Sequence, residues 1–309
     1  MIIPKTLKRG DTIGIVSPSN ILYEKEDIEK LNESISLMED AGFRIKVGKY
    51  AFANETGYGT KAIHKAEDIN RMFKDSKVKA IFSITGGNDC NSTFDYLDYN
   101  LIKENPKIIC GFSDTTSILN VITEKTGLIT YLGPSMKSIS SGETEYRYRA
   151  VIDRFVEGKT NLAEPEDLDE FKVIREGKAQ GELIGGNLSL TEDLILGKYK
   201  VNFKNKILCL EDLGFESPAA LVNHNIYTLK QNGIFDQISG IWLGNYEADA
   251  KLEDILLNAL EDIEFNKPII KSENFGHSEK KIVIPIGTKA KIDTKSKAPY
   301  IELLENCID

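Results

Sequence analysis

Short apolar runs alternate with amphipathic segments through roughly the first 130 residues of this 309-residue chain. The apolar runs Thr12–Val16, Phe43–Val47, Val78–Ile84 and Lys107–Cys110 are expected to be strands, and the segments Glu26–Ala41, Ala62–Phe73 and Thr115–Lys125 are expected to be helices. Neighbouring parallel strands need a crossover connection, usually a helix, between them. The alternation therefore predicts βαβ units and a parallel sheet.

The second half of the chain has a different texture. The segment Asn161–Lys178 is charged and poor in apolar residues, as expected for a surface connection, and short strand-like runs return after Gly181. We expect strands at Lys206–Leu210, Gly240–Gly244 and Ile282–Ile286, and helices at Thr144–Val156, Leu221–Gln231 and Leu252–Glu261. The change in texture predicts two domains, over residues 1–165 and 166–309.

Composition excludes several classes of protein. Hydrophobic residues make up 41% and charged residues 28%, as in soluble globular proteins, and the net charge of −9 argues against nucleic acid as a partner. No stretch approaches the roughly 20 apolar residues that span a bilayer, and Met1–Gly10 lacks the features of a secretion signal. A cytoplasmic protein is expected. The four cysteines form no CxxC pair and lie far in sequence from the three histidines, so a zinc site is not expected. Cys110 and Cys209 lie in apolar runs and are expected to be buried reduced thiols.

The segment Lys107–Thr116 (KIICGFSDTT) combines a buried-type strand, a tight turn with Ser113, and a helix. Such an elbow exposes a serine hydroxyl at a helix N-terminus, where free N–H groups favour a developing oxyanion. The match is partial, because Thr115 stands where the full motif has glycine. From this segment alone, a plain N-cap role for Ser113 or Asp114 is the more frequent arrangement.

Ser83–Asn91 (SITGGNDCN) places two glycines directly after a predicted strand. Glycines there let the backbone approach a ligand or a neighbouring turn, and a plain β-turn fits the segment equally well. No complete GxGxxG or GxxxxGK[ST] pattern occurs, so a nucleotide-binding Rossmann protein has little support.

A serine hydrolase needs a general base, most often histidine. His64 and His224 fall within predicted helices, where surface histidines are common, whereas His277 falls in a loop before a predicted strand. Elimination therefore favours His277. The run Leu208–Asp212 (LCLED) ends in two carboxylates, either of which could orient the histidine, and a solvated turn is the plain alternative.

Taken together, these segments resemble the LD-carboxypeptidase family of serine peptidases, which includes the microcin C self-immunity hydrolases. The resemblance covers essentially the whole chain, and its order and spacing are more specific than any one motif. It is carried by Gly10–Ser19, Ser83–Asn91, Gly111–Thr116, Gly127–Pro134, Gly181–Leu190, Lys206–Asp212, Gly233–Gly244 and Gly276–Gly287.

The resemblance implies a flavodoxin-like N-terminal α/β domain with a parallel sheet and a smaller β-rich C-terminal domain, with the active site at their interface. It implies Ser113 as nucleophile, Glu211 as acid and His277 as base, and it favours Glu211 over Asp212 by analogy. No metal or cofactor is implied, and a homodimer is expected.

Further site residues follow from the same resemblance. The backbone N–H groups of Gly87 and Asp114 are candidates for an oxyanion hole. Gly86 and Asn187 are candidates for contact with substrate, although Asn187 fits a structural turn equally well.

The expected substrate is a small peptide or aminoacyl amide. Ser83–Glu104 looks more like the microcin-immunity branch, whose nucleotide-cleaving members carry an aromatic residue, often tryptophan, that stacks on adenine. Here Ser141–Gly181 has no tryptophan, and Phe171 is its one plausible substitute. Gly214–Ser217 offers no cationic clamp either.

We therefore expect a peptide to be preferred over a nucleotide-linked amide, with a microcin C-type immunity hydrolase or a catalytically silent binding protein as alternatives. Three arginines could clamp a substrate carboxylate, although exposed positions on a helix are the plainer interpretation. They are Arg147, Arg149 and Arg154.

Overall fold

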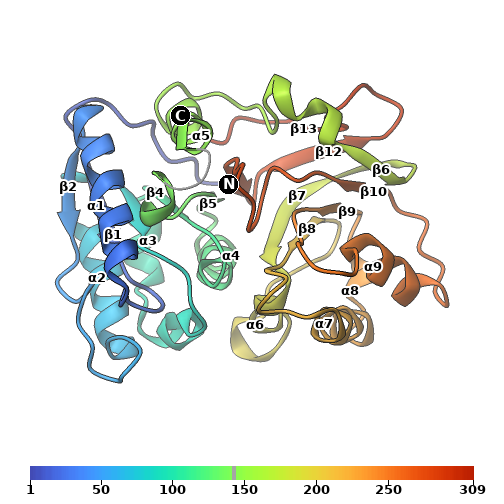
Figure 1. Cartoon of the computed structure of the whole chain (residues 1–309), viewed down its shortest axis with the longest axis horizontal. Coiled ribbons are helices and arrows are strands. Elements are labelled where there is room, and N and C mark those ends of the chain that lie inside the picture. Colours follow the sequence, from blue (N-terminus) through green and yellow to red (C-terminus); the bar gives the residue numbers. More distant parts are fainter. Residues whose placement is uncertain (141–143) are drawn as a thin grey trace.

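A computed structural model describes residues 1–140 and 144–309. Its first sheet has six strands in the order β11-β5-β4-β3-β1-β2, and the five strands from the N-terminal half are parallel (Figure 1). These five are β1 (Thr12–Val16), β2 (Arg44–Val47), β3 (Val78–Ser83), β4 (Ile108–Gly111) and β5 (Thr130–Leu132). The order 2-1-3-4-5 is that of the flavodoxin-like fold, which confirms the predicted parallel sheet.

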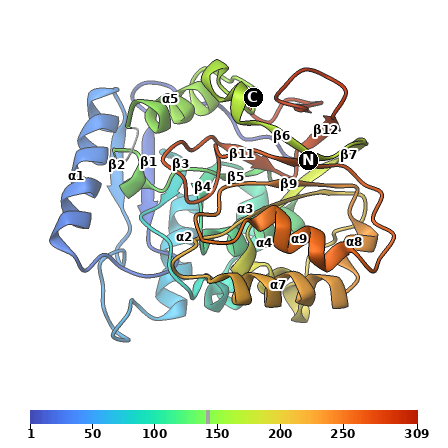
Figure 2. The same ribbon diagram turned by 45° about the vertical axis from the view of Figure 1, so that its right-hand side comes forward.

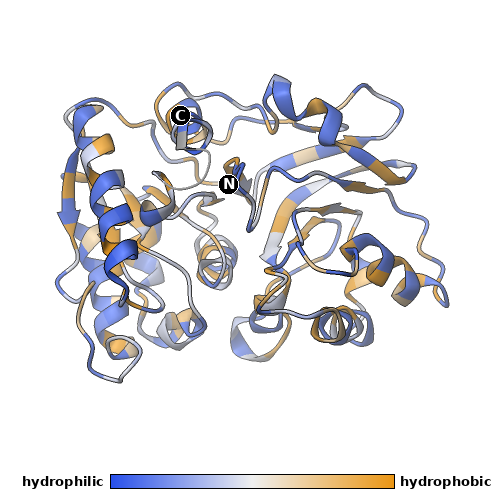
Figure 3. Cartoon of the chain, in the orientation of Figure 1, coloured by the Kyte–Doolittle hydropathy of each residue, from blue (hydrophilic) through white to orange (hydrophobic). Residues whose placement is uncertain are grey.

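Helices cover both faces of this sheet. Successive residues of a strand point to opposite faces, and buried apolar residues on each face pack against helices. Ile15 packs with residues of α1 and α5, while Val16 packs with residues of α2, α3 and α4. The helices are α1 (Lys25–Asp40), α2 (Ala62–Lys74), α3 (Tyr99–Glu104), α4 (Thr115–Thr126) and α5 (Thr144–Phe155). Hydrophilic and hydrophobic residues alternate along α1, as expected of a helix with one face on the core (Figure 3).

The second sheet has seven strands in the order β13-β12-β7-β8-β9-β10-β6. Its central strands β7 to β10 are parallel, and β6, β12 and β13 are antiparallel to their neighbours. The strands are β6 (Lys172–Arg175), β7 (Lys178–Asn187), β8 (Ile207–Glu211), β9 (Gly240–Leu243), β10 (Ile269–Lys271), β12 (Lys289–Asp293) and β13 (Ile301–Leu303).

Short helices connect these strands and pack beside them (Figure 2). The α-helices are α6 (Glu192–Ile195), α7 (Ala219–Gln231), α8 (Ile234–Gln237) and α9 (Leu252–Leu260). The 3-10 helices of the described chain are η1 (Cys90–Tyr96), η2 (Met136–Ser138), η3 (Pro165–Glu170), η4 (Leu188–Leu190) and η5 (Gly197–Tyr199).

Two expectations for the second half need correction. Asn161–Lys178 is not merely a surface connection: it contains η3 and β6, and it buries Leu162 and Phe171 in the core. The predicted strand Ile282–Ile286 is β11 (Ile284–Ile286), and it pairs antiparallel with β5 in the first sheet. Both depend on partners distant in sequence, which local composition does not report. The boundary between residues 165 and 166 stays a prediction.

Helix α4 joins the two halves of the molecule and lies between the two sheets (Figure 1). The amide of Asn120 on α4 pairs with the backbone of Gly185 on β7, donating to its carbonyl at 3.0 Å and accepting from its N–H at 2.9 Å. One hydrophobic cluster continues from α2–α4 to α7–α9. The two sheets are therefore held together through α4.

Two smaller expectations can be compared with the structure. All four cysteines are buried and free, as expected for reduced thiols. In the part of the chain that the structure describes, no helix is long and apolar enough to cross a bilayer.

Candidate active site

Ser113 lies in a tight turn between β4 and α4, with the positive φ of 59°. A non-glycine residue with φ in this region is uncommon, and such backbone strain clusters at functional sites. Asp114 occupies the N-cap position of α4 with helical backbone angles, but its side chain makes no cap hydrogen bond. The segment therefore has the strand–turn–helix geometry of the elbow motif, with Ser113 in the turn.

The loop after β3 approaches this turn closely. A Cβ atom added to Gly86 would lie 2.8 Å from Ser113 Cβ and 3.0 Å from Ser113 Oγ, so only glycine fits there. At Gly87, with φ of 151°, a Cβ would collide with the hydroxyl of Ser19. Loops that follow parallel strands meet at one edge of the sheet, which is why the loops after β1, β3 and β4 converge here.

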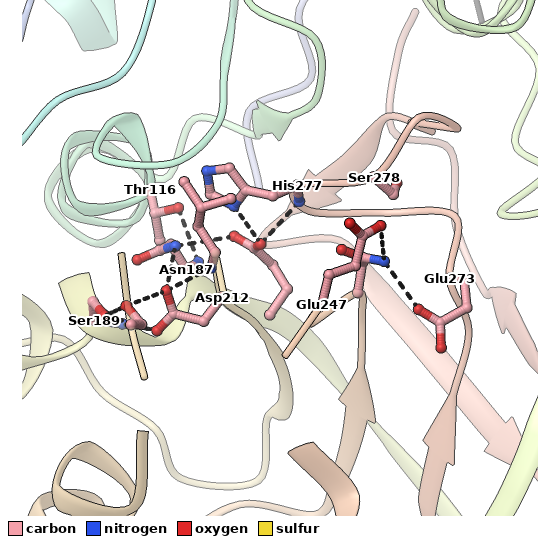
Figure 4. Close-up of polar contacts among 12 residues, drawn as sticks. Thr116, Asn187, Ser189, Asp212, Glu247, Glu273, His277 and Ser278 are labelled. Atoms are coloured by element: carbon pink, nitrogen blue, oxygen red, sulfur yellow. Dashed lines mark hydrogen bonds and ion pairs between the residues drawn. The ribbon is translucent and has the colours of Figure 1, made fainter. Parts of the chain in front are cut away.

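Glu211 and His277 meet at the corresponding edge of the second sheet. Glu211 ends β8 and is fully buried, and its Oε2 accepts hydrogen bonds from the backbone N–H of His277 at 3.0 Å and from Nδ1 at 2.7 Å (Figure 4). Gly276, with φ of 90°, makes this approach possible, because a Cβ there would lie 2.7 Å from Glu211 Cβ. The carboxylate thus holds the imidazole from two sides.

The neighbouring carboxylate of Asp212 points elsewhere. It accepts hydrogen bonds from Ser189 N–H at 3.1 Å, Ser189 Oγ at 2.7 Å, Ser217 Oγ at 2.9 Å and Leu213 N–H at 2.8 Å. Burial raises the pKa of Asp212. Of the two acids that the sequence offered, Glu211 is the one bonded to His277, because successive residues at a strand end point in opposite directions.

Asn187 ends β7 and lies between Thr116 and the two carboxylates (Figure 4). Its Nδ2 is 3.3 Å from Glu211 Oε1 and 3.4 Å from Asp212 Oδ1, and its backbone N–H donates to Thr116 Oγ1 at 3.1 Å. The side chain is 2% exposed. Asn187 therefore connects α4 to the acid and lies behind it, away from solvent.

Phe112, immediately before Ser113, brings the two edges together. Its ring contacts the imidazole of His277 with 5.1 Å between centroids. Among the described residues, His277 is hydrogen-bonded to Glu211 and no hydrogen bond joins it to Ser113.

The Nζ atom of Lys281 lies 3.2 Å from the centroid of the Phe112 ring. The lysine is 3% exposed, and burial holds its pKa well below its usual range. The sequence did not point to this residue, because a lysine pair in a polar run carries no sign of burial.

The other histidines lie away from this pair. His64 contacts Glu55 at 2.6 Å and stacks on Tyr50, and His224 lies on the exposed side of α7.

The arginine expectations need correction. Arg147 and Arg154 are neither exposed nor available as clamps: both are buried and donate to backbone carbonyls, including Ser278 O and Val283 O. Arg149 is paired with Glu166. Buried carbonyls need donors, and the guanidinium groups supply them.

Phe171 does not form an exposed platform. It is 5% exposed and stacks on Trp242 with 6.3 Å between centroids. Tyr146 and Phe155 are also buried, and residues 141–143 of the same segment lie outside the described residues.

The described residues contain no group of three or more metal-ligating side chains suited to hold an ion. A cavity of about 630 Å³ lies between residues 160–168 and 291–303, and none of the predicted site residues lines it.

Comparisons with known proteins agree with this architecture. The family description "LD-carboxypeptidase N-terminal domain" matches residues 13–133, and "LD-carboxypeptidase C-terminal domain" matches residues 180–292. A Bacillus subtilis (strain 168) protein, whose name describes a murein peptide carboxypeptidase, is 29% identical over 97% of this chain and 94% of its own length.

Two further matches concern microcin immunity. The microcin C7 self-immunity protein MccF of Escherichia coli is 27% identical over 96% of this chain and 94% of its own. A structure of MccF in complex with glutamyl sulfamoyl guanosine superposes with a TM-score of 0.89 and 25% identity over 100% of both chains. On the fold, the two matched domains and these relatives, the chain belongs to the LD-carboxypeptidase family of peptidases.

Proposed function

We propose that this protein is a serine hydrolase that cleaves an amide bond of a small peptide, with Ser113 as nucleophile, His277 as base and Glu211 as acid. The observation that carries the proposal is the pairing of His277 with a fully buried carboxylate, beside the strained turn that holds Ser113. A histidine oriented in this way through Nδ1 leaves Nε2 free to take a proton.

The reaction follows from these roles. His277 Nε2 accepts the Ser113 Oγ proton as Oγ bonds to the amide carbon, and the carbonyl oxygen becomes an oxyanion. Collapse breaks the C–N bond, and the imidazolium gives its proton to the leaving amine. Water then attacks the acyl-enzyme, with the same histidine taking and returning the proton. Glu211 stabilises the imidazolium throughout.

The oxyanion would be held by the backbone N–H groups of Asp114 and Gly87. The close packing of Gly86 on Ser113 supports this, because it brings the loop after β3 to the nucleophile. Asn187, buried behind the acid, is better suited to orienting Glu211 than to contacting substrate.

A peptide substrate is favoured over a nucleotide-linked one. The described aromatic side chains of residues 144–181 are buried, except Tyr148, which is partly buried and packs against the core beside the first sheet. That segment therefore offers no fully exposed ring for stacking on a base. Base stacking on an aromatic side chain contributes about 1–3 kcal/mol, or roughly 5- to 150-fold in binding.

Substitution of the proposed nucleophile and base tests the chemistry. Ser113→Ala and His277→Ala should each lower kcat by about 10³-fold or more, and the double variant should lose little more, because triad residues act as a unit. His64→Ala and His224→Ala serve as matched controls and should retain turnover. Normal turnover in folded Ser113→Ala, or inactivation by a control substitution alone, would contradict the proposal.

Cleavage of an aminoacyl nucleotide amide is the second candidate, favoured by the likeness to MccF bound to glutamyl sulfamoyl guanosine. Comparing kcat/KM on a murein-type tetrapeptide and on an aspartyl sulfamoyl adenosine separates the two. Phe215, 81% exposed in the turn after Glu211, is the aromatic side chain to substitute in that comparison. A preference for the adenosine compound that disappears in Phe215→Ala would favour the second candidate.

A further inference from the structure

The carboxylate of Asp114 connects three segments around the proposed nucleophile. The residue is fully buried, and its Oδ2 accepts hydrogen bonds from the backbone N–H groups of Asp89 and Cys90, both at 2.8 Å, and from the hydroxyl of Ser19. Its Oδ1 is buried and has no hydrogen-bond partner among the described residues. Burial raises the pKa of this carboxyl group.

The donors on this carboxylate belong to the segments that carry or support the proposed oxyanion hole. Asp89 and Cys90 follow Gly87 in the loop after β3, and Ser19 lies in the loop after β1, against the position where a Cβ of Gly87 would be. Asp114 itself supplies the other proposed N–H donor. One residue thus offers a donor through its backbone and fixes the second donor's loop through its side chain.

The geometry points to Asp114 as a positioning residue whose side chain sets the spacing between the N–H groups of Asp114 and Gly87. This inference rests on the proposed function and extends it to the device that keeps the oxyanion hole assembled. Oxyanion donors act at 2.7–3.1 Å from the developing charge, and an error of about 1 Å can cost about 10²-fold in rate. Two hydrogen bonds from the loop after β3 and one from the loop after β1 meet on this single oxygen, so the loop that carries Gly87 has little freedom to make that error.

A simple capping role would place the interactions elsewhere. An N-cap carboxylate accepts from the second or third N–H of its own helix, and Asp114 makes no such bond with α4. The donors that its Oδ2 accepts from lie 24 to 95 residues away in the sequence. The side chain therefore stabilises the relation between loops rather than the start of the helix.

Steady-state kinetics of three variants tests the inference. Asp114→Ala removes all three bonds and should lower kcat by about 10²-fold with KM nearly unchanged, because the donors act mainly on the transition state. Asp114→Asn can still present one oxygen to the three donors, with its amide nitrogen in place of the unpartnered oxygen. It should retain kcat within about tenfold. Ser19→Ala removes one bond and should lower kcat by about tenfold.

Asp68→Ala provides a matched control. Asp68 is 3% exposed on α2 and also accepts from two consecutive backbone N–H groups, those of Lys49 at 2.9 Å and Tyr50 at 2.7 Å, in a loop away from Ser113. The Asp68→Ala variant should lower the melting temperature, as we also expect of Asp114→Ala, but it should leave kcat unchanged. An equal fall of kcat in both variants would overturn the inference.

Other outcomes also decide the matter. Unchanged kcat in folded Asp114→Ala would refute the positioning role, as would a raised KM at constant kcat or an Asp114→Asn variant as slow as Asp114→Ala. If Asp114→Ala does not fold, unchanged kcat in Ser19→Ala would refute it instead. The proposed function fails separately, if wild-type protein is not labelled on Ser113 by a fluorophosphonate or if Ser113→Ala keeps its turnover.

Discussion

Replacing Glu211 with glutamine tests the acid of the proposed triad with little change in size. Oε2 accepts both N–H groups of His277, and Oε1 lies 3.3 Å from the donor amide of Asn187. A glutamine amide must therefore direct its NH2 group either at His277 or at Asn187. Facing Asn187 sacrifices only one long hydrogen bond, so we expect that orientation, with an oxygen still accepting from Nδ1.

The expected loss follows from the missing charge. A hydrogen bond to a charged group contributes about 1.5–3 kcal/mol, and 1.36 kcal/mol corresponds to tenfold in rate. A neutral hydrogen bond that remains contributes about 0.5–1.5 kcal/mol, so loss of the charge alone costs about 1–1.5 kcal/mol and predicts a fall in kcat/KM of roughly 5- to 15-fold. If the NH2 group turns toward His277 instead, the tautomer is wrong and the loss should approach about 10⁴-fold.

Asp212→Asn is the matched control, because Asp212 is the adjacent acid, is also buried and has no bond to His277. Four hydrogen-bond donors point at the two oxygens of Asp212, and the NH2 group of asparagine must face some of them, so this substitution should destabilise the protein by about 1–3 kcal/mol. It should keep kcat/KM within about threefold of the wild-type value. The assay is kcat/KM on a murein-type tetrapeptide, with thermal unfolding of each variant alongside. Normal activity in Glu211→Gln, or an equal loss in Asp212→Asn, would refute the assignment of the acid.

Three further predictions concern packing and pH. Gly86→Ala should lower kcat by about 10²-fold, because the added methyl group must displace Ser113, whereas Gly59→Ala, with neighbours at 3.4 Å or more, should be silent in the same assay. Phe171→Ala should lower the free energy of unfolding by about 3 kcal/mol, measured in urea, without changing the ratio of activities on peptide and adenosine substrates. Burial lowers the pKa of Lys107 to about 8, below its unfolded value of about 10.4, so the unfolded state binds more protons between those pH values. The stability of wild type relative to Lys107→Met should therefore rise from pH 8 to pH 10, and a difference that falls over this range would contradict the reasoning.

Several features of the fold could be predicted from local sequence. The strands and helices of the first half follow from apolar periodicity and glycine stops, and β1 begins and ends where the pattern predicts. The turn at Ser113 and the glycine pair at Gly86 are also visible, because a strand followed by small, flexible residues is a local signal. The part of the candidate site that lies at the first sheet can therefore be predicted from short stretches of consecutive residues.

The strands of the second sheet were predicted less well. β7 has ten residues, yet its sequence KAQGELIGGN contains three glycines and shows no regular alternation of apolar and polar residues. β6 lies in a charged segment. β11 was expected as a strand, but its place in the first sheet was not, because the other strands of that sheet lie more than 150 residues away. Pairing with distant strands, rather than propensity, makes these segments extended.

Tertiary structure alone decided which side chains meet. Glu211 and Asp212 are equivalent in sequence, and only the opposite directions of their side chains at the end of β8 give one to His277 and the other to Ser189 and Ser217. Lys281 in a polar run is buried because it packs on Phe112, a residue from the other half of the chain. Local sequence determines periodicity and turns, whereas burial and pairing depend on packing between segments far apart in the chain.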